Sequence, residues 1–204
     1  MKIFAVGLNY LSHNKEMERT FQSEEPVIFM KPETALLKGG KPFFYPDFSD
    51  EIHYETELVV KINRLGKNIA ERFAYRYWDE VTVGIDFTAR DLQRKQKELG
   101  LPWEIAKGFD GSAAIGDFIS KSEVLDIRRL NFRLDITHKR VQQGNTEDMI
   151  YSVDKIIAHI SRFFTLKMGD LIFTGTPAGI GPVAIDDHLQ GYLEERKLLD
   201  FNIK

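Results

Sequence analysis

Short apolar runs separated by turn-forming residues dominate the first half of the chain. Runs of strand length lie at 2–6, 27–31, 43–46 and 53–62, and turn signals such as "KGGKP" bound them. Glycine and proline in such clusters favour turns, and short apolar runs between turns favour β-strands. The pattern therefore predicts a succession of short β-strands in this region.

Later segments show the apolar spacing of amphipathic helices. Over 152–166 isoleucines and phenylalanines recur at intervals of three and four, which places them on one helical stripe, and Ser152 precedes the stripe as a cap. A second helix is expected at 89–99, where it would end at Gly100. A third is expected at 70–78.

Further strands are predicted at 81–87, at 130–136, where apolar and polar residues alternate, and in the apolar run before the glycine-rich turn "TGTPAGIGP". No internal repeat or linker-like composition shift interrupts the chain. The pattern predicts a single α+β domain over 1–204 that is rich in β-strands. The polar stretch from Asn9 to Glu25 lacks a convincing core face, so we expect it to be mobile.

Composition narrows the classes of function. The 204 residues are 43% hydrophobic and carry a formal net charge of −3, which suits one buried core and gives no global basic surface for nucleic acid. The absence of cysteine excludes disulfides, cysteine-based metal sites and thiolate nucleophiles. The N-terminal apolar stretch is too short for a signal peptide, and no window approaches the ~20 apolar residues of a membrane span. We therefore expect a cytoplasmic protein with no nucleic-acid or membrane partner.

The stretch "HYETE" at 53–57 raises a question of charge. Alternate residues of a strand share a face, so Glu55 and Glu57 would lie on one face with His53, roughly 7 Å apart at the backbone. Two anions held this close need water, a proton or a cation between them. His53 could be a ligand by position, although an outer role is the simpler interpretation.

Asp86 ends the strand predicted at 81–87, where an ionised group is costly unless it is paired or binds a metal. Together with Glu55 and Glu57 it would form an all-oxygen site, which suits Mg²⁺, Mn²⁺ or Ca²⁺ rather than zinc or copper. The alternative is that the glutamates lie on the solvated face of an edge strand. These residues alone leave both interpretations open.

Seven motifs in order resemble those of the fumarylacetoacetate hydrolase family. They are "GLNYLSHNKEM" (7–17), "PVIFMKP" (26–32), "HYETEL" (53–58), "GIDFTARDLQ" (84–93), "GLPWEIAKGFD" (100–110), "QGNTEDMIYS" (143–152) and "GDLIFTGTPAGIGPV" (169–183). The resemblance covers nearly the whole chain and is closest to the short single-domain acylpyruvate hydrolases and oxaloacetate decarboxylases. It implies the mixed β-sheet roll of the family's C-terminal domain, a lid at about 9–25 and a homodimer.

The resemblance also implies the residues of the site. Glu55, Glu57 and Asp86 would bind one divalent cation, usually Mg²⁺, with Mn²⁺ or Ca²⁺ also accepted. The remaining implied residues are Lys107 beside the metal, Arg90, Gln93 and Thr176 at substrate oxygens, and His13 with Glu16 in the lid. Leu8 departs from the pattern, because close relatives often have Arg before "NY".

Such a site would cleave a C–C bond of a small 2-oxo acid. In acylpyruvate hydrolysis His13, oriented by Glu16, would be the general base that activates water, whereas oxaloacetate decarboxylation needs no such base. Lys107 would supply positive charge for the carboxylate or enolate. Two alternatives stay open: an isomerase or hydratase of dienoates from aromatic catabolism, similar to 2-hydroxyhepta-2,4-diene-1,7-dioate isomerase, and a non-catalytic metal-binding scaffold.

Overall fold

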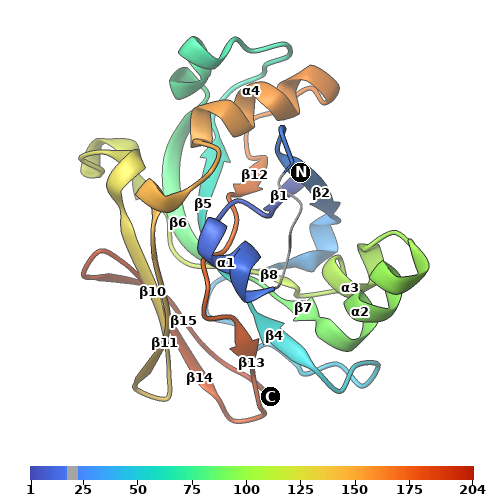
Figure 1. Cartoon of the computed structure of the whole chain (residues 1–204). Helices are drawn as coiled ribbons and strands as arrows, with labels where there is room; N and C mark the ends of the chain where they lie inside the picture. The colour runs from blue at the N-terminus through green and yellow to red at the C-terminus, as the bar shows by residue number, and fades with distance from the viewer. Residues whose placement is uncertain (18–22) are drawn as a thin grey trace.

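The computed structural model describes residues 1–17 and 23–204, so the expected lid at about 9–25 lies partly outside the described residues. Three β-sheets make up most of the architecture, and helices cover its ends and one side (Figure 1). The prediction of a β-rich α+β fold with a mixed sheet is therefore confirmed.

The largest sheet has the strand order β2-β1-β12-β5-β6-β8-β3, with β9 paired to β6. Its strands are β1 (Ile3–Gly7), β2 (Val27–Lys31), β3 (Leu36–Leu37), β5 (Thr56–Ile62), β6 (Trp78–Asp86), β8 (Ala113–Ile115), β9 (Ile119–Ser120) and β12 (Leu171–Phe173). The sheet is mixed, because β1 pairs with β12 and β3 with β8 in parallel while the other neighbours are antiparallel.

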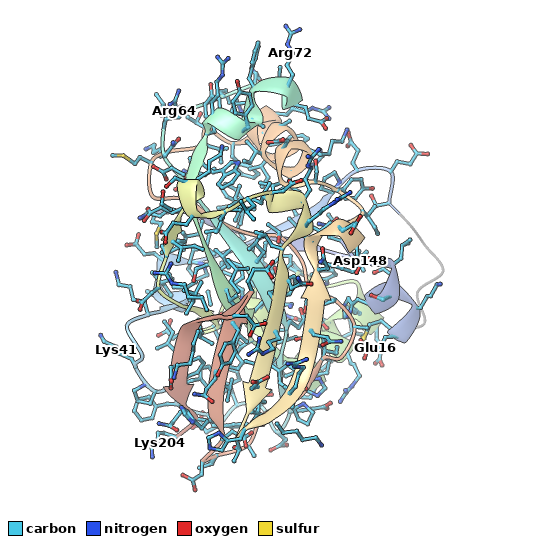
Figure 2. All side chains as sticks on the ribbon, turned by 90° about the vertical axis from the view of Figure 1, so that its left-hand side faces the viewer. Glu16, Lys41, Arg64, Arg72, Asp148 and Lys204 are labelled. Carbon is cyan, nitrogen blue, oxygen red and sulfur yellow. The ribbon has the colours of Figure 1, made fainter. Side chains whose placement is uncertain are left out.

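Two smaller sheets complete the fold. The four-stranded sheet, with the order β11-β10-β14-β15, contains β10 (Asn131–Ile136), β11 (Lys139–Asn145), β14 (His188–Leu193) and β15 (Arg196–Asn202). It faces the viewer in Figure 2, and its alternation of buried and polar residues follows the pattern expected at 130–136. The three-stranded sheet contains β4 (Ile52–Tyr54), β7 (Thr88–Ala89) and β13 (Gly181–Pro182).

The described α-helices are α1 (Leu11–Glu16), α2 (Arg90–Leu99), α3 (Glu104–Lys107) and α4 (Val153–Phe163). The predicted start of α4 is confirmed, since the Ser152 hydroxyl accepts a hydrogen bond from the amide of Lys155 at 3.2 Å. The predicted end of α2 is confirmed as well, because Gly100 adopts the left-handed conformation with φ at 65°. No helix in the described part of the chain is long and apolar enough to span a membrane.

The strands β5 and β6 lie at the centre of the molecule and are almost wholly buried. Val60, Val81 and Val83 belong to one hydrophobic cluster with Ile156 of α4 and Phe132 of β10. Burial of this apolar surface on both faces is the main stabilising contribution to the fold, at about 25 cal/mol for each Å² removed from water.

Three local predictions were wrong. Residues 43–46 form no strand, and Phe43 makes only an isolated bridge to Ile203. The expected helix at 70–78 is a 3₁₀ helix from Glu71 to Arg76, after which β6 begins. The strand expected through 53–62 is broken at Glu55 into β4 and β5, which belong to different sheets.

Candidate metal centre and active site

The central strand pair brings the three predicted acids together. Glu57 pairs with Gly84 in the register of β5 and β6, and the carbonyl of Glu55 accepts a hydrogen bond from the amide of Asp86 at 2.8 Å. A side chain at Gly84 would start within 2.7 Å of Val59, so only glycine allows the sheet to pack this tightly here.

Glu55, Glu57 and Asp86, referred to below as the acidic cluster, are buried, and each offers an oxygen within 4.8 Å of the others. His53 does not join the cluster, because the break at Glu55 separates it and its Nε2 lies 3.0 Å from Glu51. The prediction of an outer position for His53 fits this geometry. The interpretation of a solvated strand face is wrong, since the carboxylates of the two glutamates are buried.

Glu55 is surrounded by cations. Lys107 donates to its Oε2 at 2.7 Å and Arg90 to its Oε1 at 2.6 Å. Burial alone would raise the pKa of Glu55, but the positive charges of Lys107 and Arg90 hold that pKa well below its usual range. Lys107 also donates to Oδ2 of Asp86 at 2.8 Å and to the hydroxyl of Thr88 at 2.6 Å.

Glu57 has the opposite environment. Among residues 1–17 and 23–204, one hydrogen bond reaches its carboxylate, from the amide of Gly175 at 2.7 Å from Oε2. Burial and the nearby charge of Asp86 raise the pKa of Glu57 well above its usual range. A positive charge within the cluster would oppose both causes of this shift.

The donor set fits a hard divalent cation. All three candidate ligands are carboxylate oxygens, which Mg²⁺, Mn²⁺ and Ca²⁺ prefer, and they are close enough to share one ion. The under-compensated carboxylate of Glu57 supports the fit, because burial of an anion without a cation is costly. The chain therefore has a buried acidic cluster suited to a divalent metal.

A cavity of about 30 Å³ opens onto this cluster. Its lining includes eight of the nine predicted site residues: His13, Glu55, Glu57, Asp86, Arg90, Gln93, Lys107 and Thr176. The apolar part of its wall comes from residues that include Leu8, Phe29 and Trp103. Glu16, the ninth predicted residue, reaches the cavity through His13.

Arg90 and Gln93 are joined at the start of α2, where their i, i+3 spacing places them on one face. Arg90 donates to the side-chain oxygen of Gln93 at 2.7 Å. Arg90 therefore contacts a cluster carboxylate and a neighbouring amide, and both side chains line the cavity.

His13 lies on α1 and is 7% exposed. Its Nδ1 is 3.4 Å from Glu16 Oε2, and the Glu16 carboxylate accepts from the amide of Gly179 at 3.1 Å. Burial lowers the pKa of His13 in spite of the negative charges of Glu55 and Glu16, which favours the neutral imidazole that a general base requires. Figure 2 labels Glu16 at the end of α1, at the rim of the molecule.

Thr176 is fixed by a residue that sequence reasoning missed. Its hydroxyl donates to the carbonyl of Thr56 at 2.9 Å and accepts from Nε2 of Gln142 at 2.9 Å. Gln142 also accepts from the amide of Thr56 at 2.9 Å. The only sequence signal was the position of Gln142 directly before the motif that begins at residue 143.

Lys31 was missed as well, although it lies inside the motif "PVIFMKP". Its ammonium is 2.6 Å from Oδ1 of Asp86, with the lysine side chain 0% exposed. Lysine at the end of an edge strand is usually solvated, so periodicity gave no reason to place it beside the acids.

Three features together define the class of protein. They are a β-rich fold, a buried acidic cluster suited to a metal, and a histidine and a lysine that line the same cavity. The family model described as "Fumarylacetoacetate (FAA) hydrolase C-terminal" matches residues 2–204, and the chain belongs to this family. The resemblance proposed from the motifs is therefore confirmed, and with it the assignment of the chain to a family of enzymes.

Three relatives show which members of the family the chain is similar to. The chain is 38% identical over 202 residues to mitochondrial oxaloacetate tautomerase FAHD1 of Mus musculus, covering 99% of this chain and 91% of the relative. It is 41% identical over 189 residues to oxaloacetate tautomerase YcgM of Escherichia coli, covering 92% and 86%. It superposes on fumarylpyruvate hydrolase from Pseudomonas aeruginosa, in complex with Mn²⁺ and pyruvate, with a TM-score of 0.93, 35% identity and coverage of 100% and 89%.

Proposed function

We propose that the chain is a divalent-metal-dependent enzyme that forms and stabilises the enolate of a small 2-oxo acid. The observation that carries the proposal is the charge balance around the cavity. The three carboxylates of the acidic cluster face three buried cations, which are Lys31, Arg90 and Lys107. A divalent ion would leave two positive charges, which is the charge that one carboxylate and one enolate oxygen together neutralise.

Oxaloacetate is the first substrate we propose, and interconversion of its enol and keto forms is the first reaction. Two of the relatives described above are named oxaloacetate tautomerases. Conversion of the enol to the keto form removes the proton of the C2 hydroxyl and adds a proton at C3, so one base that receives the first proton and donates it to C3 balances the reaction.

The residues of the chain have separate roles in this proposal. The bound cation, for which we propose Mg²⁺ with Mn²⁺ as a substitute, supplies Lewis-acid polarisation of the substrate's keto group. His13 receives the hydroxyl proton of the enol and donates it to C3, with the reverse transfers from the keto form, and Glu16 orients its imidazole. Lys107 donates to the oxygen on which negative charge develops.

Substrate orientation falls to the remaining lining residues. Arg90 and Gln93 have N–H donors at the same cavity, which suits a carboxylate and a keto oxygen, and Thr176 lines the cavity beside them. Binding of metal or substrate would draw Lys107 and Arg90 away from Glu55, whose charge the cation would then compensate.

Cleavage of a C–C bond is the second candidate function. The fumarylpyruvate hydrolase relative holds Mn²⁺ and pyruvate, a product expected when an acylpyruvate is cleaved. Acylpyruvate hydrolysis would use His13 to activate water, and oxaloacetate decarboxylation would use the enolate-stabilising groups alone. Isomerisation of a dienoate would use the same groups.

A turnover screen tests the proposal. Purified protein would be given enol-oxaloacetate, keto-oxaloacetate, acetylpyruvate and fumarylpyruvate, each with Mg²⁺ and with EDTA. We expect rapid loss of the enol's ultraviolet absorbance that EDTA abolishes. Failure to turn over any of these acids with Mg²⁺ or Mn²⁺ would favour the non-catalytic scaffold. The expected homodimer and cytoplasmic location are separate predictions, for light scattering and cell fractionation.

A further inference from the structure

Lys31 is a fully buried lysine that lies behind the acidic cluster. It is the last residue of β2, an edge strand of the large sheet. The other residues of β2 are half-buried, whereas the Lys31 side chain is 0% exposed. A lysine that loses all contact with water requires full compensation of its charge and its N–H donors.

Asp86, Ser112 and Lys107 compensate the charge and the N–H donors of Lys31. The Lys31 ammonium lies 2.6 Å from Oδ1 of Asp86. It also donates to the carbonyl of Ser112 at 3.0 Å, to the hydroxyl of Ser112 at 3.1 Å, and to the carbonyl of Lys107. The Ser112 hydroxyl in turn donates to the carbonyl of Lys107 at 2.8 Å. One ammonium therefore joins the ends of β2, β6 and α3.

These contacts divide the two oxygens of Asp86. Oδ1 forms an ion pair with Lys31 at 2.6 Å, whereas Oδ2 accepts a hydrogen bond from the Lys107 ammonium at 2.8 Å, and Lys107 lines the cavity. Because buried ion pairs contribute little net stability, a pair this well surrounded is better explained by the geometry that it fixes.

We propose that Lys31 is a positioning residue of the metal site, an inference that rests on the proposed function. By pairing with Oδ1, it fixes the orientation in which the Asp86 carboxylate would bind the cation. By holding the carbonyl of Lys107, it fixes the backbone from which the Lys107 ammonium reaches the site. Groups behind metal ligands commonly act in this way.

The test compares Lys31→Met with the matched variant Lys61→Met. Lys61 pairs with Glu80 at 2.5 Å on the same sheet, is 35% exposed and does not line the cavity. Titration with Mn²⁺ should give a dissociation constant about 10–100-fold higher for Lys31→Met and unchanged for Lys61→Met. The electron paramagnetic resonance spectrum of the Mn²⁺-saturated Lys31→Met should also differ from wild type, because the Asp86 carboxylate is then free to change its orientation.

Ser112→Ala keeps the test decisive if circular dichroism shows that Lys31→Met does not fold. It removes one acceptor of Lys31 and the hydrogen bond to Lys107 without changing the ion pair with Asp86. We expect a rise of about 2–10-fold in the Mn²⁺ dissociation constant, the usual worth of a hydrogen bond.

The results separate this inference from the proposed function. A wild-type protein that binds no Mn²⁺ would overturn both. A wild type that binds Mn²⁺, together with a folded variant of unchanged dissociation constant and spectrum, would overturn the role of Lys31 alone. Tighter binding in Lys31→Met would also overturn it, because Lys31 would then act only by repelling the metal.

Discussion

Glu55 and Glu57 are two residues apart, yet their side chains meet opposite electrostatic conditions. Lys107 and Arg90 donate to Glu55, whereas Glu57 faces Asp86 with one amide donor among the described residues. The same residue type therefore has a lowered pKa at one position and a raised pKa at the other. The sequence predicted that these acids would crowd one another, but it gave no means to tell which carboxyl would have the raised pKa.

The first prediction concerns Glu57→Gln. A carboxyl whose pKa is higher in the folded chain than its ordinary value of 4.5 costs stability as the pH rises above that value. The lowered pKa of Glu55 affects stability only as the pH falls below its ordinary value, so it does not contribute in this range. In EDTA the melting temperature of Glu57→Gln relative to the wild type should therefore rise between about pH 5 and 8, a comparison in which the lowered pKa of His13 acts on both proteins alike.

Glu57→Gln should also weaken Mg²⁺ binding by at least about tenfold, because the site loses a full charge. Glu55→Gln should do the same. Calorimetric titration measures both. Wild-type affinity in both variants would show that the cluster does not bind the metal.

The second prediction concerns His13→Ala. Loss of a positioned general base should reduce acylpyruvate hydrolysis and enol–keto interconversion by about 10²–10⁴-fold, and oxaloacetate decarboxylation much less. The test is to measure kcat and KM for each of these reactions in His13→Ala and to compare them with the wild type. Equal losses of kcat in all of them would instead assign His13 to ordering of α1. Asp86→Ala should abolish every reaction.

At the scale of elements, the periodicity of apolar residues predicted those helices and strands whose formation depends on the local sequence alone. The run 27–31 is β2 with the same bounds, and the stripe at 152–166 contains α4. The prediction of a helix at 70–78 failed because the aromatic residues of this segment resemble the buried face of an amphipathic helix. Phe73 and Tyr75 are instead 39% and 47% exposed and lie under arginine side chains, while Trp78 is already part of β6. The break at Glu55 has no sequence signal, because an apolar run does not reveal where the chain changes sheets.

The third prediction concerns the attachment of α1. The Glu16 carboxylate contacts both His13 and the amide of Gly179 in the loop before β13. Glu16→Gln keeps an oxygen for that amide, whereas Glu16→Ala removes it. If α1 is held through this contact, Glu16→Ala should lose about tenfold or more in kcat/KM and Glu16→Gln only a few-fold. Similar losses in both would mean that the negative charge beside His13 is what matters.

The fourth prediction separates fold from function. Ser152→Ala removes the cap of α4, which packs on the core away from the cavity. Loss of such a cap costs about 1 kcal/mol, or roughly 2–4 °C in melting temperature for a chain of this size. Thermal melts should show this decrease while kcat and KM stay at wild-type values. A change in kcat would indicate coupling between α4 and the site.

At the scale of the whole molecule, the motifs predicted which residues line the site but not the contacts that fix their positions. Their order led to the family and so to eight residues that line one cavity. The strand order and the contacts of Lys31 with Asp86 and of Gln142 with Thr176 join segments far apart in the chain. Such contacts depend on how sheets pack, which the local pattern of residues does not encode.

The fifth prediction is that a divalent cation stabilises the whole fold. A ligand that binds only the folded state at 100 times its dissociation constant adds about 2.7 kcal/mol. For a chain of this size that is a rise of roughly 5–10 °C in melting temperature. Calorimetric scans with Mg²⁺ and with EDTA measure it. An unchanged melting curve at saturating Mg²⁺ would contradict a metal site in the folded chain.

The ammonium of Lys107, placed between Glu55 and Asp86, bears on how the protein matures in a cell. It supplies a positive charge to two of the acids without any metal, so we expect the chain to fold before it binds the ion. Small zinc domains differ, because their chains are unfolded without the ion. If the chain is the metal-dependent enzyme proposed above, synthesis and activation are separate events. A cell short of metal would then accumulate folded but inactive protein that can be loaded later, instead of unfolded chains marked for degradation.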